Sequence, residues 1–119
     1  DVLHGGGGND WVGSEGGNDQ IFGDDGNDFL YGGEGNDTLN GGSGYDTAVF
    51  SGNRADYTMT KNSNGSWTVT DNNHTNGHTN EGADTLTGVE FVQFTDQSVT
   101  LMGNNSWLNQ LAQSSVLFF

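Results

Sequence analysis

The amino-acid sequence predicts an all-β protein, in which a parallel β-roll over residues 1–50 is followed by a β-rich cap over residues 51–119 that has room for a short helix. Three observations predict this fold. An aspartate recurs every nine residues through the first part of the chain, an apolar residue stands two places after each aspartate, and glycines crowd the places before it. A unit of nine residues is too short to bury an apolar face by itself, so successive units must stack.

The nine-residue register holds without a slip from residue 1 to residue 49. The repeated acidic positions are Asp1, Asp10, Asp19, Asp28, Asp37 and Asp46. The apolar positions that follow them are Leu3, Val12, Ile21, Leu30, Leu39 and Ala48. A flexible linker rich in Gly and Asp has no reason to keep two kinds of residue in register, so we expect regular structure here.

Glycine explains the turn in each unit, and the apolar residue explains the strand. Glycine reaches left-handed backbone conformations, so the chain can turn tightly and direct several carbonyl groups at one point. The three residues after each aspartate then form a short strand whose middle side chain points inward. Two units make one coil of about eighteen residues. Turns on one edge centre on Asp1, Asp19 and Asp37, and turns on the other edge centre on Asp10, Asp28 and Asp46.

The same count assigns the outward side chains to two different sheets. One sheet shows Trp11, Phe29, Tyr31, Thr47 and Val49, and the other shows Val2, His4, Gln20, Phe22, Thr38 and Asn40. The first outer face is too aromatic for contact with water alone, so we expect something to pack on it.

Composition and charge narrow the range of functions. Only 30% of residues are hydrophobic and the formal net charge is −14, with ten acidic residues and no Lys or Arg in residues 1–46. Nucleic acid and anionic membranes are poor partners for such a chain, because phosphate binding needs basic residues. Cysteine is absent, which excludes disulfides and thiolate metal sites, and the sequence has no apolar run that could span a membrane. Divalent cations are therefore the natural counter-charge.

The repeats carry a family resemblance. They read GGGGNDWVG (5–13), SEGGNDQIF (14–22), GDDGNDFLY (23–31), GGEGNDTLN (32–40) and GGSGYDTAV (41–49). These units resemble the RTX (repeats-in-toxin) family, whose hemolysin-type calcium-binding nonapeptide is G-G-x-G-x-D-x-U-x. The segments DTAVFSGNRADYTMT (46–60) and ADTLTGVEFVQFTD (83–96) resemble the C-terminal flank of secreted RTX proteins. The resemblance implies a calcium-binding β-roll at the C-terminal end of a bacterial protein that leaves the cell by type I secretion.

Stacked turns bring carboxylates and carbonyls of neighbouring coils together, and calcium takes six to eight such oxygens. We expect three pairs of aspartates to hold one ion each, so that about three or more Ca²⁺ ions are bound. The pairs are Asp10 with Asp28, Asp28 with Asp46, and Asp19 with Asp37, and the shared Asp28 would use both of its oxygens. The resemblance implies that carbonyls of the first and third residues of one turn join those of the second and fourth residues of the next. These carbonyl ligands are Gly5, Gly7, Ser14, Gly16, Gly23, Asp24, Asp25, Gly26, Gly33, Gly35, Gly42 and Gly44.

Two turns depart from the repeat. The second unit begins with Ser14 and Glu15, and the third has Asp24 and Asp25 where glycine and a variable residue are usual. Backbone carbonyls bind a metal whatever the side chain, so the sites need not be lost, but the turn geometry there is expected to differ.

After Val49 the nonapeptide stops, and a different pattern begins. The expected elements are a hairpin of residues 57–61 and 67–70 around Asn64–Gly65, a polar loop over residues 71–82, strands over residues 90–95 and 98–101 around residues 96–97, and a short helix over residues 105–113. A stack of repeats leaves an open end with unpaired strand edges, and residues 51–119 are the segment that could cap it. The family resemblance implies that this segment also contains the secretion signal, at its C-terminal end.

The leading interpretation is a calcium-binding module that folds on calcium binding after type I secretion and stabilises a larger extracellular protein. In a calcium-poor cytosol the acidic repeats would repel one another and stay unfolded, so that folding and metal binding are one equilibrium. The resemblance implies two partners: an upstream domain of the same polypeptide and the type I secretion machinery.

The alternative is a carbohydrate-binding or adhesin module that uses Trp11, Phe29 and Tyr31 to bind a polysaccharide. The chain itself is not expected to be an enzyme, although an upstream part of the parent protein would be a natural place for one. Its glycine-rich turns complete neither G-x-G-x-x-G nor a Walker motif, and it has no G-x-S-x-G elbow. No catalytic residue is therefore expected among the acidic side chains of the turns, which serve first as ligands.

Overall fold

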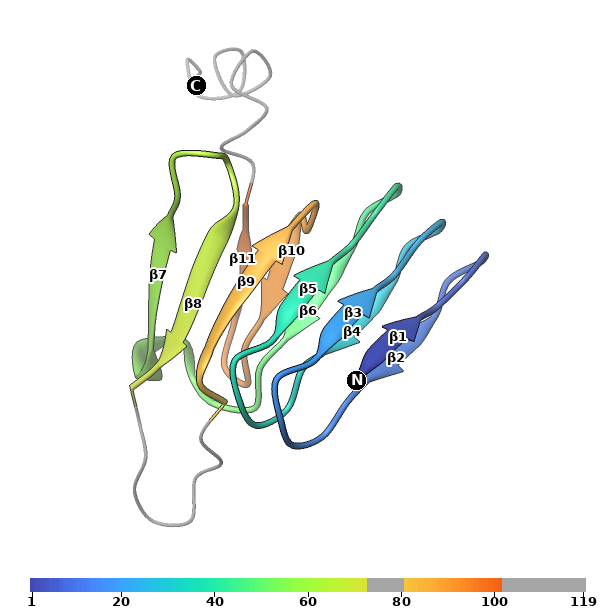
Figure 1. Cartoon of the computed structure of the whole chain (residues 1–119). Helices are drawn as coiled ribbons and strands as arrows, with labels where there is room; N and C mark the ends of the chain where they lie inside the picture. The colour runs from blue at the N-terminus through green and yellow to red at the C-terminus, as the bar shows by residue number, and fades with distance from the viewer. Residues whose placement is uncertain (73–80, 102–119) are drawn as a thin grey trace, which may run out of the picture.

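The computed structural model describes residues 1–72 and 81–101, which form two β-sheets wound into a flattened roll (Figure 1). The elements are β1 (Val2–His4), β2 (Trp11–Gly13), β3 (Gln20–Phe22), β4 (Phe29–Tyr31), β5 (Thr38–Asn40), β6 (Thr47–Val49), η1 (Arg54–Asp56), β7 (Tyr57–Lys61), β8 (Trp67–Asp71), β9 (Ala83–Thr87), β10 (Phe91–Gln93) and β11 (Ser98–Thr100). One sheet has the strand order β1-β3-β5-β9-β8-β7, and the other has the order β11-β10-β6-β4-β2.

The strands of the repeats alternate between the two sheets, as a roll requires. β1, β3 and β5 pair in parallel in one sheet, and β2, β4 and β6 pair in parallel in the other. Ile21 pairs with Leu39 and Leu30 pairs with Ala48, so each strand pairs with the strand that lies one full coil further along the chain. The predicted all-β fold with a parallel β-roll is confirmed.

The core of the roll is one side chain thick. Ile21, Leu30, Leu39 and Ala48 are completely buried between the sheets. They are the middle residues of their strands, which the nine-residue spacing identified. Each strand contributes only one buried side chain, so the apolar area that stabilises a coil is small.

The roll does not end at residue 50, where the sequence analysis placed the boundary between roll and cap. β9 pairs in parallel with β5, and β10 pairs in parallel with β6, so the segment 83–93 adds one more coil to both sheets. Leu86 and Val92 continue the buried row. The strand β9 was not predicted, although EGADTLT (81–87) differs from EGNDTLN (34–40) at only two places.

The end of the stack is closed by two antiparallel pairs. β7 and β8 form the predicted hairpin and extend the first sheet beyond β9, and β10 and β11 form the second predicted pair. Phe50, Tyr57 and Phe94 pack together there, with ring centroids 5.2–5.9 Å apart. The aromatic cluster covers the apolar end of the roll, as a cap must.

A buried carboxylate joins this cap to the last coil. Glu81 accepts hydrogen bonds from the hydroxyl of Tyr57 and from the backbone N–H of Ser51. Its own N–H donates to a carboxylate oxygen of Asp71 at 2.9 Å. These contacts hold the start of β9 against the hairpin.

The expected helix over residues 105–113 lies outside the described residues, and so does most of the expected polar loop over residues 71–82. Within residues 1–72 and 81–101, no helix is long and apolar enough to cross a membrane.

Candidate metal centre

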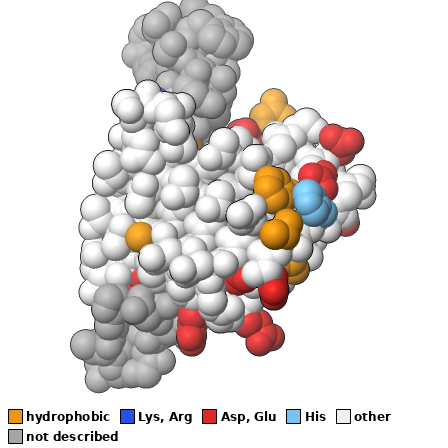
Figure 2. Space-filling view, viewed as in Figure 1, with side chains coloured by type: hydrophobic (Ala, Val, Ile, Leu, Met, Phe, Trp, Pro, Cys, Tyr) orange, Lys and Arg blue, Asp and Glu red, His pale blue; other side chains and the backbone are white. Residues whose placement is uncertain are grey.

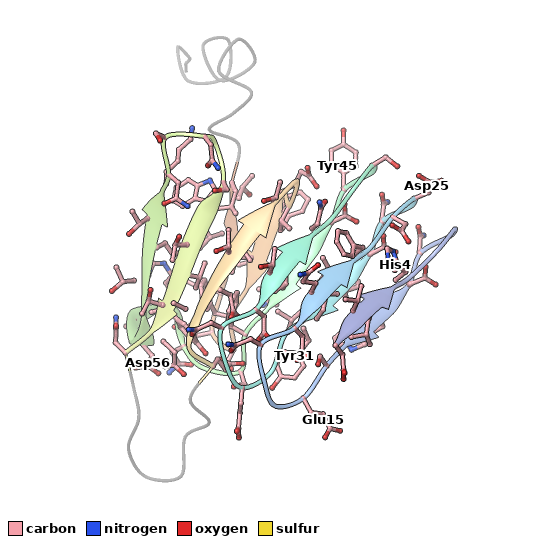
Figure 3. All side chains as sticks on the ribbon, in the orientation of Figure 1. His4, Glu15, Asp25, Tyr31, Tyr45 and Asp56 are labelled. Atoms are coloured by element: carbon pink, nitrogen blue, oxygen red, sulfur yellow. The ribbon has the colours of Figure 1, made fainter. Side chains whose placement is uncertain are left out.

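The turns of the roll form two rows, one along each edge. The Asp28 row consists of residues 5–10, 23–28 and 41–46, and the Asp19 row consists of residues 14–19 and 32–37. Asp25 and Tyr45 lie on the Asp28 row and Glu15 lies on the Asp19 row (Figure 3). Acidic side chains gather along both rims of the molecule in the space-filling view (Figure 2).

Close stacking explains the glycine at the fourth place of each turn. Gly26 has a φ of 102°, and a Cβ atom at this residue would overlap the carbonyl oxygen of Gly8 in the preceding coil. Gly44 stands in the same relation to Gly26. A larger residue would therefore separate the coils as well as strain the backbone.

The repeated aspartates form a ladder that links each coil to the next. The N–H of Asp10 donates to Oδ1 of Asp28 at 2.8 Å, and the N–H of Asp28 donates to Oδ1 of Asp46 at 2.9 Å. On the other edge, the N–H of Asp19 donates to Oδ1 of Asp37 at 2.8 Å. Each carboxylate thus uses one oxygen to satisfy a buried backbone donor.

A second ladder runs in the opposite direction and was not foreseen. The side-chain oxygen of Asn9 accepts the N–H of Asn27 at 2.7 Å, and that of Asn27 accepts the N–H of Tyr45 at 2.8 Å. Asn18 and Asn36 repeat the contact on the Asp19 row at 2.7 Å. The sequence signal for it was the Asn that precedes most of the repeated aspartates.

The second oxygen of most repeated aspartates has no partner. Among the described residues, the buried side-chain oxygens without a hydrogen bond are Oδ2 of Asp10, Asp28, Asp37 and Asp46. Asp28, Asp37 and Asp46 are at most 2% exposed. An ionised oxygen buried without a partner is strongly unfavourable, so these positions fit a bound cation.

In the Asp28 row, each unpartnered oxygen faces a carbonyl group of the following turn. A Cβ atom built on Gly23 would lie 2.6 Å from Oδ2 of Asp28 and 2.8 Å from the carbonyl oxygen of Gly41. A Cβ atom on Gly5 would lie 3.0 Å from Oδ2 of Asp10 and 2.9 Å from the carbonyl oxygen of Gly23. Two oxygens therefore converge on a space that glycine leaves open between neighbouring turns.

The donors decide which kind of metal this space suits. No group of three or more Asp, Glu, His or Cys side chains comes together in the part of the chain that the structure describes. A cation in the gap between two turns would depend on carbonyl oxygens beside the carboxylates. An all-oxygen set with many carbonyls favours calcium over zinc, which prefers nitrogen and sulfur, and over magnesium, which retains its waters.

Burial raises the pKa of several of these carboxyl groups. The pKa of Asp46 rises to about 7 because of burial, and the neighbouring carboxylates of Glu90 and Asp28 add to the effect. Burial likewise raises the pKa of Asp37 to about 6, and that of Asp84 to about 8. The ionised groups therefore lack a counter-charge, which a divalent cation would supply.

Asp19 is the exception among the repeated aspartates. The hydroxyl of Ser14 donates a hydrogen bond to Oδ2 of Asp19, the oxygen that is free in the other turns. Ser14 occupies the first place of its turn, where the other turns have glycine. The predicted site of Asp19 with Asp37 therefore has a protein donor in the position where a cation would be needed.

The two departures from the repeat have different effects. Asp24 has a φ of 68° and keeps the left-handed conformation that glycine has at the same place in other turns. Its side chain accepts the N–H of Gly6 at 3.2 Å and lies 3.2 Å from His4. Glu15 is not in the left-handed region, so its turn differs in backbone path as well as in the hydroxyl of Ser14.

The structure also bears on how the expected ligands would be used. The sequence analysis gave both oxygens of Asp28 to metal, and this stays a prediction. Oδ2 is without a partner, and Oδ1 accepts the N–H of Asp10 but has a second lone pair. The order of the carbonyl ligands around each ion stays a prediction. The expected carbonyl ligands at the first place of a turn are Gly5, Ser14 and Gly23, and those at the second place are Asp24, Gly33 and Gly42. Those at the third place are Gly7, Gly16 and Asp25, and those at the fourth place are Gly26, Gly35 and Gly44.

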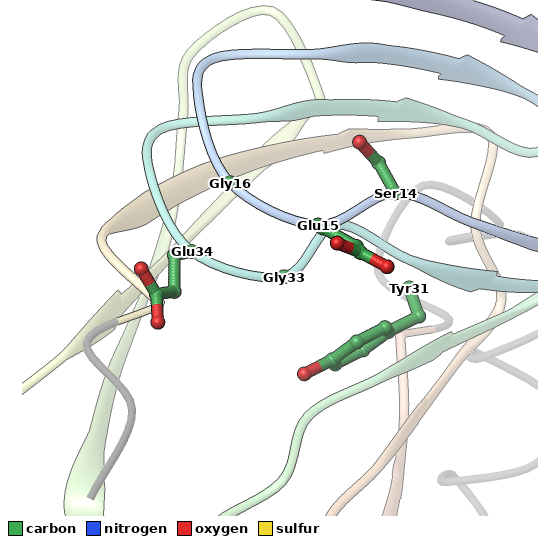
Figure 4. A pocket seen from close by; sticks show the side chains of 6 residues that line it. All are labelled: Ser14, Glu15, Gly16, Tyr31, Gly33 and Glu34. Carbon is green, nitrogen blue, oxygen red and sulfur yellow. The ribbon is translucent and has the colours of Figure 1, made fainter.

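An open pocket lies beside the Asp19 row (Figure 4). It is lined by Ser14, Glu15, Gly16, Tyr31, Gly33 and Glu34. Burial raises the pKa of the Tyr31 hydroxyl, and the charges of Glu81, Glu34 and Asp84 add to this. The pocket combines an aromatic ring with exposed carboxylates but shows no converging set of donors.

Comparison with known proteins agrees with this geometry. The family model of the RTX calcium-binding nonapeptide repeat, with four copies, matches residues 1–21 and 14–48. Residues 1–48 are RTX calcium-binding nonapeptide repeats. RTX repeats bind several Ca²⁺ ions, and they typically occur in proteins that bacteria secrete. No curated protein matches the chain.

Proposed function

We propose that this chain is a calcium-triggered folding module that orders after type I secretion from a bacterium and stabilises a larger extracellular protein. The observation that carries the proposal is the set of four buried carboxylate oxygens without a partner, on Asp10, Asp28, Asp37 and Asp46. A roll with these oxygens ionised and uncompensated is unstable, so the fold depends on a cation. The proposal gives the chain a binding role and no catalytic one.

Composition supports the same conclusion. The chain carries a formal net charge of −14, and each strand of the roll buries only one apolar side chain. So thin a core offsets little of the conformational entropy that is lost when the turns become ordered. Repulsion among the carboxylates opposes the compact state further when no cation is present.

The expected contribution of calcium is large enough to decide the folded state. A site occupied at ten times its dissociation constant adds about 1.4 kcal/mol to the free energy of unfolding. Three such sites add roughly 4 kcal/mol, compared with a total of about 5–15 kcal/mol for an ordinary domain. Calcium-poor cytosol and calcium-rich surroundings would therefore select the unfolded and the folded state, respectively.

Circular dichroism during a calcium titration tests the proposal. In chelator we expect little β signal, and in millimolar calcium a cooperative gain of it, because the turns close only with a counter-charge. Magnesium at the same concentration should restore much less, since it demands octahedral geometry and keeps its waters. A complete β spectrum in chelator that calcium leaves unchanged would falsify the proposal.

Carbohydrate binding is a second candidate, because two aromatic side chains are exposed on the outer face of the roll. Trp11 is 66% exposed and Phe29 is 44% exposed on the outer face of one sheet. Their rings stack on each other with centroids 5.1 Å apart, which covers one face of each ring. A sugar platform needs open ring faces, so the stack favours a packing role over this candidate.

A further inference from the structure

The last coil of the roll comes from residues that lie outside the nonapeptide repeats. β10 pairs in parallel with β6, and the turn before it consists of Gly88, Val89 and Glu90. This turn is three residues shorter than the turn 41–46 on which it stacks. It nevertheless extends the Asp28 row by one step.

Gly88 takes the place of the first residue of a repeat turn. A Cβ atom built on Gly41 would overlap the carbonyl oxygen of Gly88 and lie 2.5 Å from Oδ2 of Asp46. Gly23 faces Gly41 and Asp28 in the same way within the repeats. The carbonyl and carboxylate oxygens that converge inside the repeats therefore converge once more at the end of the row.

Glu90 takes the place of the repeated aspartate. Its Oε1 accepts the N–H of Asp46 at 2.8 Å, just as Oδ1 of Asp46 accepts the N–H of Asp28 at 2.9 Å. The additional methylene group of Glu gives the carboxylate a longer reach from a shorter turn. A carboxylate thus stands at the same step of the ladder although the sequence has no nonapeptide there.

The unpartnered carboxylate oxygen between the turns 41–46 and 88–90 belongs to Asp46. Oδ2 of Asp46 has no partner and the residue is completely buried. Within the described residues, the close acid–base contacts are Asp1 with Asp19 and His4 with Asp24, and neither involves Asp46 or Glu90. Two carboxylates and a carbonyl face one another here with no positive group beside them.

We propose that residues 88–90 complete an additional calcium site with Asp46, at the step where the nonapeptide repeats have ended. Asp46 supplies Oδ2, Gly88 supplies its carbonyl oxygen, and Glu90 supplies the second carboxylate. The inference rests on the proposed function, since it assumes that the gaps between turns hold calcium. The site ties the last coil, and with it the cap, to the calcium-dependent roll.

Calcium counting on the full chain tests the site with two variants and one control. Glu90→Gln removes the charge but retains an oxygen that can accept the N–H of Asp46. Gly41→Ser fills the space between Asp46 and Gly88, in imitation of Ser14, which the roll accommodates at the same place in its turn. Glu34→Gln is the matched control, because Glu34 has an exposed side chain on the opposite row.

The number of bound ions per chain is measured by equilibrium dialysis against saturating calcium, with circular dichroism to verify the β signal. Each variant should bind one ion fewer than the wild type, or bind its last ion at least about tenfold more weakly, since ligand charge sets calcium affinity. The control should bind the wild-type number.

A wild-type count and affinity in either folded variant overturns the additional site. If Glu90→Gln does not fold, Gly41→Ser alone decides. A wild-type chain that binds no calcium sinks the proposed function instead, and this result differs from a variant that matches a calcium-binding wild type.

Discussion

The two rows of turns arise from the same repeat, yet they satisfy their aspartates in different ways. In the Asp28 row the first residue of every turn is glycine, and Oδ2 of Asp10, Asp28 and Asp46 is left without a partner. In the Asp19 row Oδ2 of Asp37 is likewise without a partner, but the hydroxyl of Ser14 donates to Oδ2 of Asp19. A single hydroxyl group at the first place thus separates a turn that needs a cation from a turn that has a donor of its own.

The difference shows how the dependence on metal is distributed over the fold. A hydroxyl satisfies one lone pair but leaves the carboxylate charge in place, whereas a divalent cation neutralises the charge and bridges two coils. The Asp28 row should therefore carry most of the calcium dependence, and the Asp19 row should provide a part of the roll that calcium controls less.

The largest effect is expected from Asp28→Asn compared with Asp10→Asn. Asp28 faces two gaps, through Oδ1 toward Asp10 and Oδ2 toward Gly41, whereas Asp10 faces only one gap between turns of its row. Asp28→Asn should lose two ions and about 3 kcal/mol of calcium-dependent stability, and Asp10→Asn about half of each. Calcium counting and thermal melting in calcium measure both quantities.

Asp96→Asn is the control for that pair, since Asp96 is exposed and lies outside both rows. Equal losses of calcium from Asp28→Asn and Asp10→Asn would contradict the sharing of Asp28 between gaps.

A change of pH should act on the metal-free roll in a direction opposite to its action on the calcium form. The pKa values of Asp37, Asp46 and Asp84 are raised to about 6, 7 and 8 by burial, from an ordinary value of 3.8. Protonation of these groups therefore stabilises the folded state fully below about pH 4, and this stabilisation is lost as the pH rises through about 6 to 8. In chelator, the β signal in circular dichroism should therefore be greater at about pH 5 than at about pH 8.

In calcium the same acidification should lower the melting temperature, since protons compete with the cation for the carboxylates. A chelated protein that is equally stable at both pH values would show that the buried carboxylates do not govern the metal-free fold.

Ser14→Gly should turn the Asp19 row into a copy of the Asp28 row. Without the hydroxyl, Oδ2 of Asp19 loses its donor, which should cost about 1–3 kcal/mol of stability in chelator. In calcium the chain should bind one additional ion, and the cost should be largely recovered. Isothermal titration calorimetry gives the number of ions, with Ser43→Gly as the matched control because Ser43 is exposed and donates only to Asp25 in the other row.

An unchanged ion count in Ser14→Gly would mean that the hydroxyl is not what distinguishes the two rows.

The smallest effect is expected on the outer aromatic face, which belongs to neither row. Replacing Trp11 and Tyr31 together by Ala should lower stability by about 1 kcal/mol through loss of the Trp11–Phe29 stack, and equally so at all calcium concentrations that fold the chain. Thermal melting and retention on a polysaccharide column are the two measurements. Unchanged stability with abolished retention would make carbohydrate binding the main function.

Much of the roll could be predicted because the residues that determine each turn and strand lie close together in the sequence. The spacing of Asp28 and Leu30, repeated every nine residues, fixes the turn, the inward side chain and the sheet to which each strand belongs. The hairpin around Asn64–Gly65 could also be predicted, because this turn-forming pair stands between two segments in which large and small residues alternate. Both kinds of signal act over fewer than about ten residues.

The last coil and the exceptional turn could not be predicted in this way. Asp84 stands 47 residues after Asp37 rather than 18, and Glu90 replaces aspartate in a turn that is three residues short, so the periodicity was lost. The role of Ser14 depends on the distance between its hydroxyl and the carboxylate of Asp19, which spacing alone does not give. Only the three-dimensional stack brings these groups together.

The detour of the chain before β9 has a consequence for the order in which the roll assembles. Ladder contacts within the repeats join residues 18 apart, but the contact of Asp37 with Asp84 joins residues 47 apart. Closing the longer loop costs roughly 0.9 kcal/mol more in chain entropy. Growth of the stack along the repeats is therefore the easier process, and the last coil should join a roll that already exists. It should also be the first to detach, so amide hydrogen exchange is expected to be faster in β9 and β10 than in β4 and β5.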